Sequence, residues 1–120
     1  MSSIQDEIVS QKQLAIVEKY EAVVNYLYPV FFNLRKQHAV LREKAQACLF
    51  DQVGLFIEAG KSNQVSKLHL ADANLAMLRW YLRFMVDDAR KLITLHQHQV
   101  AGILIAETGN LLGAWIRSRK

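Results

Sequence analysis

The sequence predicts an all-α protein that folds as an antiparallel, up-down-up-down four-helix bundle. Apolar residues recur at alternating intervals of three and four along most of the chain, which is the period of helices packed lengthwise on one another. Alternating apolar and polar runs, which would indicate strands, are absent, and only one proline and five glycines interrupt the 120 residues. Because 52% of the residues are hydrophobic, the chain can form its own core, and we expect a single domain over residues 1–120.

The first helix is expected over residues 12–36. Two neighbouring apolar stripes run along it; one contains Ile16, Tyr20, Val23, Leu27, Val30 and Leu34, and the other contains Leu14, Val17, Val24, Tyr28 and Phe31. A single stripe would cover a bundle core, so the extra width indicates a second apolar neighbour such as another subunit. Pro29 removes a backbone hydrogen bond within this segment, which predicts a kink near residues 25–29 or, alternatively, two shorter helices.

The second helix is expected over residues 38–59 and the third over residues 63–91. Gly60 stands where a left-handed residue would end the second helix, and Ser62 and Asn63 are both good N-caps for the third. Each helix has one inward stripe. In the second helix it consists of Leu41, Ala45, Cys48, Leu49, Val53 and Phe56, and in the third of Leu68, Ala71, Leu75, Leu78, Leu82, Met85 and Ala89.

The fourth helix is expected over residues 95–117. It opens with a capping-box pattern, in which Thr94 precedes Gln97 by three residues, and it continues to a basic end. Gly109 and Gly113 lie four residues apart on this helix and indicate a tightly packed neighbour, either inside the bundle or in an adjacent subunit. Short connections between the helices make consecutive helices antiparallel neighbours.

A cationic row lies beside the inward stripe of the third helix. Arg79, Arg83 and Arg90 fall within about 40° of one another at about 100° per residue. Aromatic residues interleave with them, at Trp80, Tyr81 and Phe84. The combination is consistent with base stacking plus phosphate contacts, with a protein interface, or with a solvated face on which arginines cover core aromatics.

The charge of the chain is unevenly distributed. The formal net charge is +4; residues 61–91 contribute +3 and residues 92–120 contribute +2, whereas the first 60 residues contribute −1. This asymmetry favours nucleic acid or another polyanion as a partner.

Enzyme, metal and cofactor sites are not predicted. His96 and His98 point about 200° apart on a helix, so they cannot share a metal from one face. Residues 60–62 read Gly-Lys-Ser but lack the preceding strand and glycine of a P-loop. Cys48 is the only cysteine and lies on an inward stripe. Because a single cysteine cannot form an intramolecular disulfide, we expect a cytoplasmic protein. No apolar run approaches the roughly 18 residues that a membrane span needs.

Four segments resemble the accessory variability determinant proteins of diversity-generating retroelements. They are IVEKYEAVVNYLYPV at residues 16–30, GKSNQVSKL at residues 60–68, ADANLAMLRWYLRFM at residues 71–85 and LIAETGNLLGAWI at residues 104–116. The Tyr-Leu-Tyr-Pro and Lys-Ser-Asn-Gln-Val-Ser-Lys runs are not required by any helical period, so they make the resemblance specific. The chain is also similar to the wider group of four-helix-bundle proteins encoded in bacterial ribosomal-RNA intervening sequences.

The resemblance implies a non-catalytic protein that assembles into a homo-oligomer, a pentameric barrel. It implies binding to the retroelement reverse transcriptase and to template-repeat RNA, with DNA as a further partner, during mutagenic cDNA synthesis and retrohoming. The residues expected to contact polymerase or nucleic acid are Arg79, Arg83, Arg90, Lys61 and Lys67. The residues expected in the oligomer interface are Tyr20, Tyr28, Trp80 and Tyr81. The alternative is a stand-alone basic bundle that binds RNA or DNA.

Overall fold

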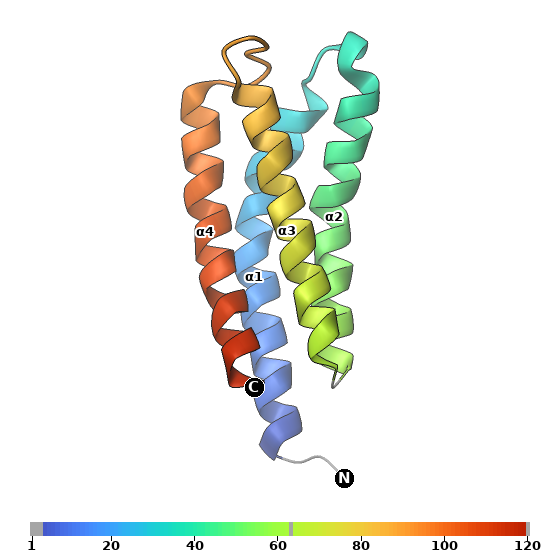
Figure 1. Ribbon diagram of the computed structural model, residues 1–120, viewed down its shortest axis with the longest axis vertical. Helices are drawn as coiled ribbons and strands as arrows, with labels where there is room; N and C mark the ends of the chain where they lie inside the picture. Colours follow the sequence, from blue (N-terminus) through green and yellow to red (C-terminus); the bar gives the residue numbers. More distant parts are fainter. Residues whose placement is uncertain (1–3, 63, 120) are drawn as a thin grey trace.

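The computed structural model describes residues 4–62 and 64–119, and the side chains from residue 11 onward within them. Four helices make up nearly all of this part of the chain, which contains no strand (Figure 1). They are α1 (Ile4–Phe32), α2 (Ala39–Lys61), α3 (Val65–Val86) and α4 (Leu95–Ser118), with a 3₁₀ turn, η1 (Lys36–His38), before α2. The predicted all-α class and the four helices are therefore confirmed.

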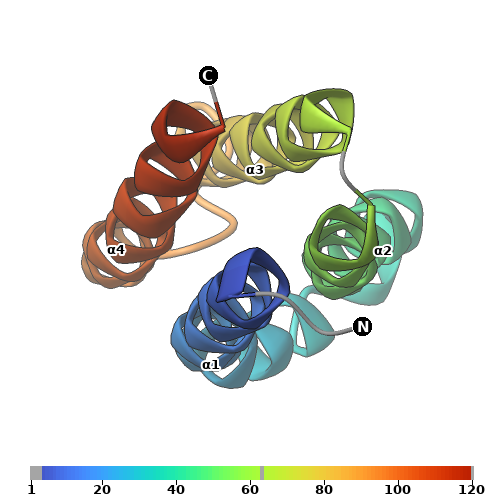
Figure 2. The same ribbon diagram turned by 90° about the horizontal axis from the view of Figure 1, so that it is seen from below.

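The four helices stand at the corners of an elongated bundle of 53 × 22 × 21 Å. Each helix packs against two others, α1 and α3 both contacting α2 and α4. Figure 1 shows the chain rising through α1, descending through α2, rising through α3 and descending through α4. Seen along the long axis, α1 lies across the bundle from α3 (Figure 2). The loops after α1 and α3 therefore lie at one end of the bundle, and the loop after α2 lies at the other.

Most of the predicted inward residues are buried in the core, but Val30, Leu41 and Val53 are only half-buried, and Phe31, predicted for the second stripe of the first helix, is buried. In α3 the buried residues are Leu68, Ala71, Leu75, Leu78, Leu82 and Met85. In α1 they include Ile16, Tyr20, Val23, Leu27 and Phe31, and in α4 they are Ala101, Ile105, Thr108, Leu112 and Trp115. The hydroxyl of Tyr20 donates a hydrogen bond to the carbonyl oxygen of Leu49 over 2.6 Å, so this buried hydroxyl has a partner.

The α1 helix is longer at its start and shorter at its end than predicted. It begins at Ile4 rather than residue 12 and ends at Phe32 rather than residue 36. It is continuous through Pro29, so the alternative of two shorter helices is wrong. Pro29 stands one turn from the end, and its carbonyl oxygen accepts a hydrogen bond from the Asn33 amide over 3.0 Å. The lost amide would have donated to the carbonyl oxygen of Asn25, so the missing hydrogen bond lies in the turn before Pro29. The kink near residues 25–29 stays a prediction.

The junction between α2 and α3 differs from the prediction at both of its caps. Gly60 lies inside α2, which continues to Lys61, and no described glycine has a positive φ. A Cβ at Gly60 would lie 2.9 Å from the Cβ of Gln13, so this glycine permits the close approach of α1 and α2. Ser62 caps the end of α2, and its hydroxyl accepts a hydrogen bond from the Gln64 amide over 3.1 Å.

The N-cap of α3 is Gln64, so the prediction of Ser62 as an N-cap is wrong. Asn63, the other predicted cap, lies outside the described residues.

The α3 helix ends at Val86, five residues before the predicted end. The carboxylate of Asp87 accepts a hydrogen bond from the Ala89 amide over 2.9 Å, and this local turn competes with further helix. Acidic side chains are also unfavourable at the negative end of a helix dipole. Ala89 is consequently an exposed loop residue rather than part of the inward stripe, and Ile93 fills the core at that end.

The capping box predicted for α4 is confirmed. The hydroxyl of Thr94 accepts a hydrogen bond from the Gln97 amide over 2.9 Å, and the Gln97 side-chain oxygen accepts one from the Thr94 amide over 2.9 Å. The two bonds satisfy backbone donors that have no partner within the helix. They define where α4 begins, at Leu95.

A buried polar network joins α2 to α3. Gln52 is fully buried, and its amide donates a hydrogen bond to the carbonyl oxygen of Ala71 over 2.8 Å. The side-chain amide of Asn74 donates to the side-chain oxygen of Gln52 over 2.7 Å and to the carbonyl oxygen of Cys48 over 3.0 Å. Because each buried polar group has a partner, the network can hold the two helices in one register without a desolvation penalty.

Candidate functional site

The predicted cationic row is divided by the early end of α3. Arg79 and Arg83 remain on α3, four residues apart, and both line a groove of about 340 Å³ between α3 and α4. The other lining residues are Ala76, Leu82, His98, Gly102 and Ile105. Arg90 lies in the loop after α3, so it does not belong to this groove.

Gly109 makes room for Arg79. A Cβ at Gly109 would lie 2.8 Å from the Nη2 atom of Arg79, so any other residue there would push the guanidinium away. Gly113 has a similar relation to Arg117, whose Nη1 atom would lie 3.3 Å from an added Cβ. The tightly packed neighbour that the two glycines predict is thus, at both positions, an arginine of the same chain.

Arg90 folds back over the outer side of α3. Its guanidinium carbon lies 3.8 Å from the centre of the Phe84 ring, and Nη1 lies 3.6 Å from a carboxylate oxygen of Asp87. Phe84 in turn stacks on Trp80, with ring centres 5.3 Å apart. Arg90 is therefore a member of a cation–aromatic cluster rather than of a straight row.

The predicted basic residues do not form one site. Lys61 ends α2 and Lys67 lies in the first turn of α3, at the end of the bundle where these two helices connect (Figure 1). The loop that holds Arg90 is at the opposite end.

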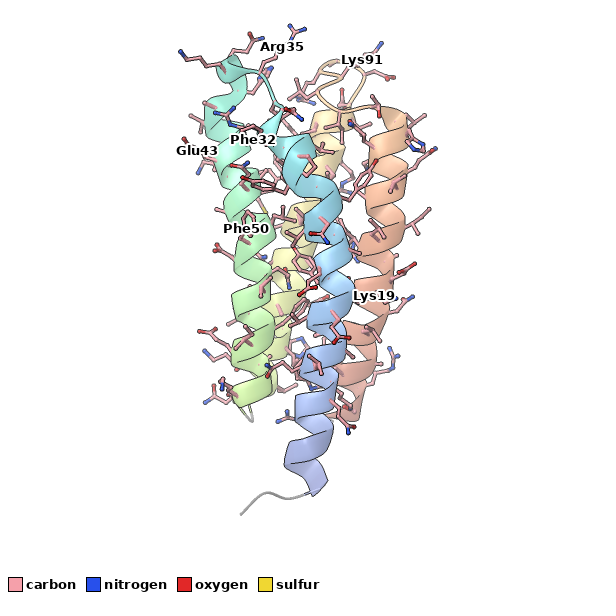
Figure 3. The ribbon with its side chains drawn as sticks, turned by 180° about the vertical axis from the view of Figure 1, so that it is seen from behind. Lys19, Phe32, Arg35, Glu43, Phe50 and Lys91 are labelled. Atoms are coloured by element: carbon pink, nitrogen blue, oxygen red, sulfur yellow. The ribbon has the colours of Figure 1, made fainter. Side chains whose placement is uncertain are left out.

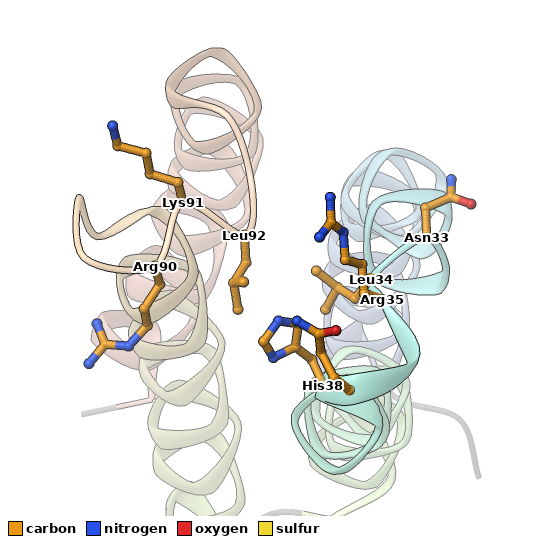
Figure 4. Close-up of a pocket in the computed structure, with 8 residues that line it drawn as sticks. Asn33, Leu34, Arg35, His38, Arg90, Lys91 and Leu92 are labelled. Carbon is orange, nitrogen blue, oxygen red and sulfur yellow. The ribbon is translucent and has the colours of Figure 1, made fainter.

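A cationic end that the sequence patterns did not predict lies beside Arg90. The loop after α1 and the loop after α3 enclose a cavity of about 420 Å³ (Figure 4). Four lining residues have basic side chains, Arg35, His38, Arg90 and Lys91. Arg42 donates a hydrogen bond to the carbonyl oxygen of Leu34 over 3.2 Å and so attaches the first loop to α2. Figure 3 shows Arg35 and Lys91 at this same end.

The two loops lie some fifty residues apart in sequence, so a search for charge runs misses the cationic end. In the sequence, the basic pairs Arg35-Lys36 and Arg90-Lys91 were the signal from which the cationic end could have been predicted. Both follow helices that run toward the same end of the bundle. Lys91 has a left-handed backbone, with φ of 51°, and its amide donates a hydrogen bond to the Asp87 carbonyl oxygen over 2.8 Å.

The four residues predicted for an oligomer interface differ in how much of each side chain is exposed. Tyr20 is completely buried within the bundle of one chain, so it has no surface to offer a partner. Tyr28 is 44% exposed, as is Trp80, while Tyr81 is half-buried beside Trp80. Tyr28 contacts the rings of Phe32 and Phe50, with centres 6.0 and 5.7 Å away. Phe32 and Phe50 lie on one side of the bundle, at α1 and α2 (Figure 3).

A second apolar stripe runs along α3 on the side away from the core. Its residues are spaced three and four apart and are Leu70, Ala73, Met77, Trp80 and Phe84. At about 100° per residue this stripe is centred about 150° from the buried one. Leu70, Met77 and Trp80 are 52%, 44% and 44% exposed. We call it the outer stripe of α3; exposed apolar side chains gathered on one face are typical of interaction surfaces.

The described residues offer little for catalysis. Burial raises the pKa of the Cys48 thiol to about 11, with a smaller contribution from Asp51, so at neutral pH the thiol is protonated and a poor nucleophile. Burial also raises the pKa of Tyr20. Within residues 4–62 and 64–119 no three histidine, cysteine, aspartate or glutamate side chains come together as metal ligands. In the same residues, no helix has the length and apolar character to cross a membrane.

The match to a protein family covers nearly the whole bundle. No curated protein matches the chain. The family model described as bAvd-like matches residues 14–119, which include most of α1 and all of α2, α3 and α4. Proteins of this kind are accessory, non-catalytic helical proteins. Since the match extends over far more than half of the sequence, this chain belongs to the bAvd-like family.

Proposed function

We propose that this chain is the accessory protein of a diversity-generating retroelement. In this proposal it binds the retroelement reverse transcriptase and the template RNA in the cytoplasm and is required for mutagenic cDNA synthesis and retrohoming. Family membership carries the proposal. The surface supports it, because Arg79 and Arg83 line a groove with aliphatic residues and lie next to the exposed Trp80 in sequence and the half-buried Tyr81 and Phe84. Trp, Tyr and Arg are enriched where proteins bind proteins.

We also propose that the protein acts as a homo-oligomer, with five copies as the number that the family resemblance implies. The outer stripe of α3 and the aromatic group of Tyr28, Phe32 and Phe50 lie on different sides of the bundle. An interface that joins two different surfaces of the same chain is heterologous, and repeated heterologous contacts form a ring when the rotation between neighbouring copies closes and an open filament when it does not. Trp80 and Tyr81 would lie on one surface of such an interface and Tyr28 on the other.

The test of polymerase binding is capture of a purified reverse transcriptase from a diversity-generating retroelement. Charge reversal by Arg79→Glu with Arg83→Glu should reduce capture by at least about tenfold, because charge-assisted hydrogen bonds contribute about 1.5–3 kcal/mol each. A matched control is Arg117→Glu with Lys44→Glu, which changes the net charge equally and alters another arginine that lies over a glycine. Capture by the Arg79/Arg83 variant at the control level, with the same helical circular dichroism, would contradict the assignment.

The second candidate function is that of a stand-alone basic bundle that binds RNA or DNA. The cationic end, with Arg35, Arg90 and Lys91 around one cavity, favours it. In that case RNA affinity of the protein alone should fall steeply with salt, and the log–log slope should fall by about one for each phosphate contact removed by Arg35→Gln or Lys91→Gln. Weak binding whose affinity is insensitive to salt would exclude this candidate.

A further inference from the structure

The groove between α3 and α4 has an aliphatic floor with open space at its centre. Its floor residues are Ala76, Leu82, Gly102 and Ile105. Gly102 is exposed, and apart from its chain neighbours and the backbone of its own helix no heavy atom lies within 4 Å of the position that its Cβ would occupy. A glycine in the middle of a helix is unfavourable for the helix itself. Here it leaves a gap through which another backbone or an aliphatic side chain can approach α4.

The rim of the groove is cationic, and no acidic side chain of the described residues pairs with its two arginines. Arg79 and Arg83 are both exposed, and neither guanidinium has an ion pair or hydrogen bond with the part of the chain that the structure describes. His98 is the third polar lining residue, and no carboxylate lines the groove. The Arg79 guanidinium already lies against α4 at Gly109, which limits the space open to it on that side, so less side-chain freedom is lost when it binds a carboxylate.

The chemistry of the lining favours a protein segment over a nucleic acid. Single-stranded nucleic acids bind where bases can stack on large aromatic rings, and no Phe, Tyr or Trp lines this groove. Trp80 is about 100° further round α3 than Arg79 and stacks on Phe84 outside the groove. A second copy of the chain is disfavoured by its own net charge of +4, which opposes approach to a cationic rim.

We propose that this groove docks an acidic amphipathic helix of the protein partner. Aliphatic side chains of that helix lie on the floor beside Gly102, and its aspartate or glutamate carboxylates pair with Arg79 and Arg83. The inference rests on the proposed function and deepens it, since the partner helix belongs to the reverse transcriptase. It names the chemistry of the bound segment and the place of its contact.

Blocking the groove without altering the fold tests the proposal. Gly102→Leu places a side chain in the open space, and Gly54→Leu is its matched control. Gly54 is likewise an exposed glycine in the middle of a helix, α2, with no heavy atom within 4 Å of an added Cβ. Both variants should keep full helical circular dichroism. Capture of the retroelement reverse transcriptase that the wild-type chain binds should fall at least tenfold with Gly102→Leu and remain at the wild-type level with Gly54→Leu.

Crosslinking identifies the occupant. With the photoreactive residue p-benzoylphenylalanine in place of Gly102, the assembled complex should yield a crosslink to a polymerase segment that carries aspartate or glutamate among aliphatic residues. A crosslink to RNA or to a second copy would overturn the proposal, as would wild-type capture by Gly102→Leu. If the wild-type chain captures no polymerase at all, the proposed function fails, and this occupant of the groove fails with it.

Discussion

Single buried polar residues decide how α2 and α3 meet. Gln52 reads in the sequence as an ordinary solvated helix residue, yet it is fully buried because Asn74 and Ala71 supply its hydrogen-bond partners. Those partners lie about twenty residues away, so no local pattern could have placed Gln52 in the core. Gly60 is a similar case, since its neighbour is Gln13 on another helix.

Removal of Asn74 should measure the strength of this network. Asn74→Ala leaves the side-chain oxygen of Gln52 buried without its partner and should lower the free energy of unfolding by about 1–3 kcal/mol. The measurement is urea unfolding followed by circular dichroism. Asn110→Ala, at an exposed position in α4, is the matched control. Equal midpoints for the two variants would show that the network does not stabilise the fold.

At the scale of the helices, local sequence signals predicted the start of α4 correctly but predicted the ends of α2 and α3 wrongly. The start of α4 was predicted correctly because a capping box involves residues only three apart. The end of α3 was missed because the apolar period allows Ala89 in the stripe, while Asp87 turns the backbone before it. Gly60 was wrongly given a left-handed conformation because glycine also serves close approach between helices.

The capping box should contribute measurably to stability. Thr94→Ala removes the hydroxyl that accepts from the Gln97 amide and should cost about 1 kcal/mol, whereas Thr94→Ser keeps that acceptor and should cost less. Thermal or urea unfolding of the three proteins provides the comparison. If the serine and alanine variants lose the same stability, the hydroxyl is not the cause.

At the scale of the whole molecule, one chain leaves much apolar surface uncovered. The outer stripe of α3 has the same spacing as the buried stripe, and the aromatic group around Tyr28 lies on another side of the bundle. The bundle core accounts for one face of each helix only. The wide apolar face of α1 thus contributes residues both to the core, where Tyr20 is buried, and to the surface, where Tyr28 is exposed.

Light scattering should therefore give a mass that is a multiple of the 13.8 kDa of one chain. Met77→Glu with Trp80→Glu places two charges in the outer stripe of α3 and should shift the protein towards the monomer while the helical circular dichroism persists. Leu95→Glu is the control, because Leu95 is 65% exposed at the start of α4, away from that stripe. A wild-type protein that remains monomeric at all concentrations tested would contradict this prediction.

By itself, the sequence determined the all-α class, the four helices, most of their inward residues and the cap of α4. These features depend on helical period and on contacts within one turn, which are local. Only the tertiary structure decided that Arg79 and Arg83 share a groove with α4, that Arg90 leaves it, and that Arg35 meets Lys91 at a cationic end. These sites combine segments that are far apart in the chain. Their geometry therefore depends on how the helices pack and where each one ends.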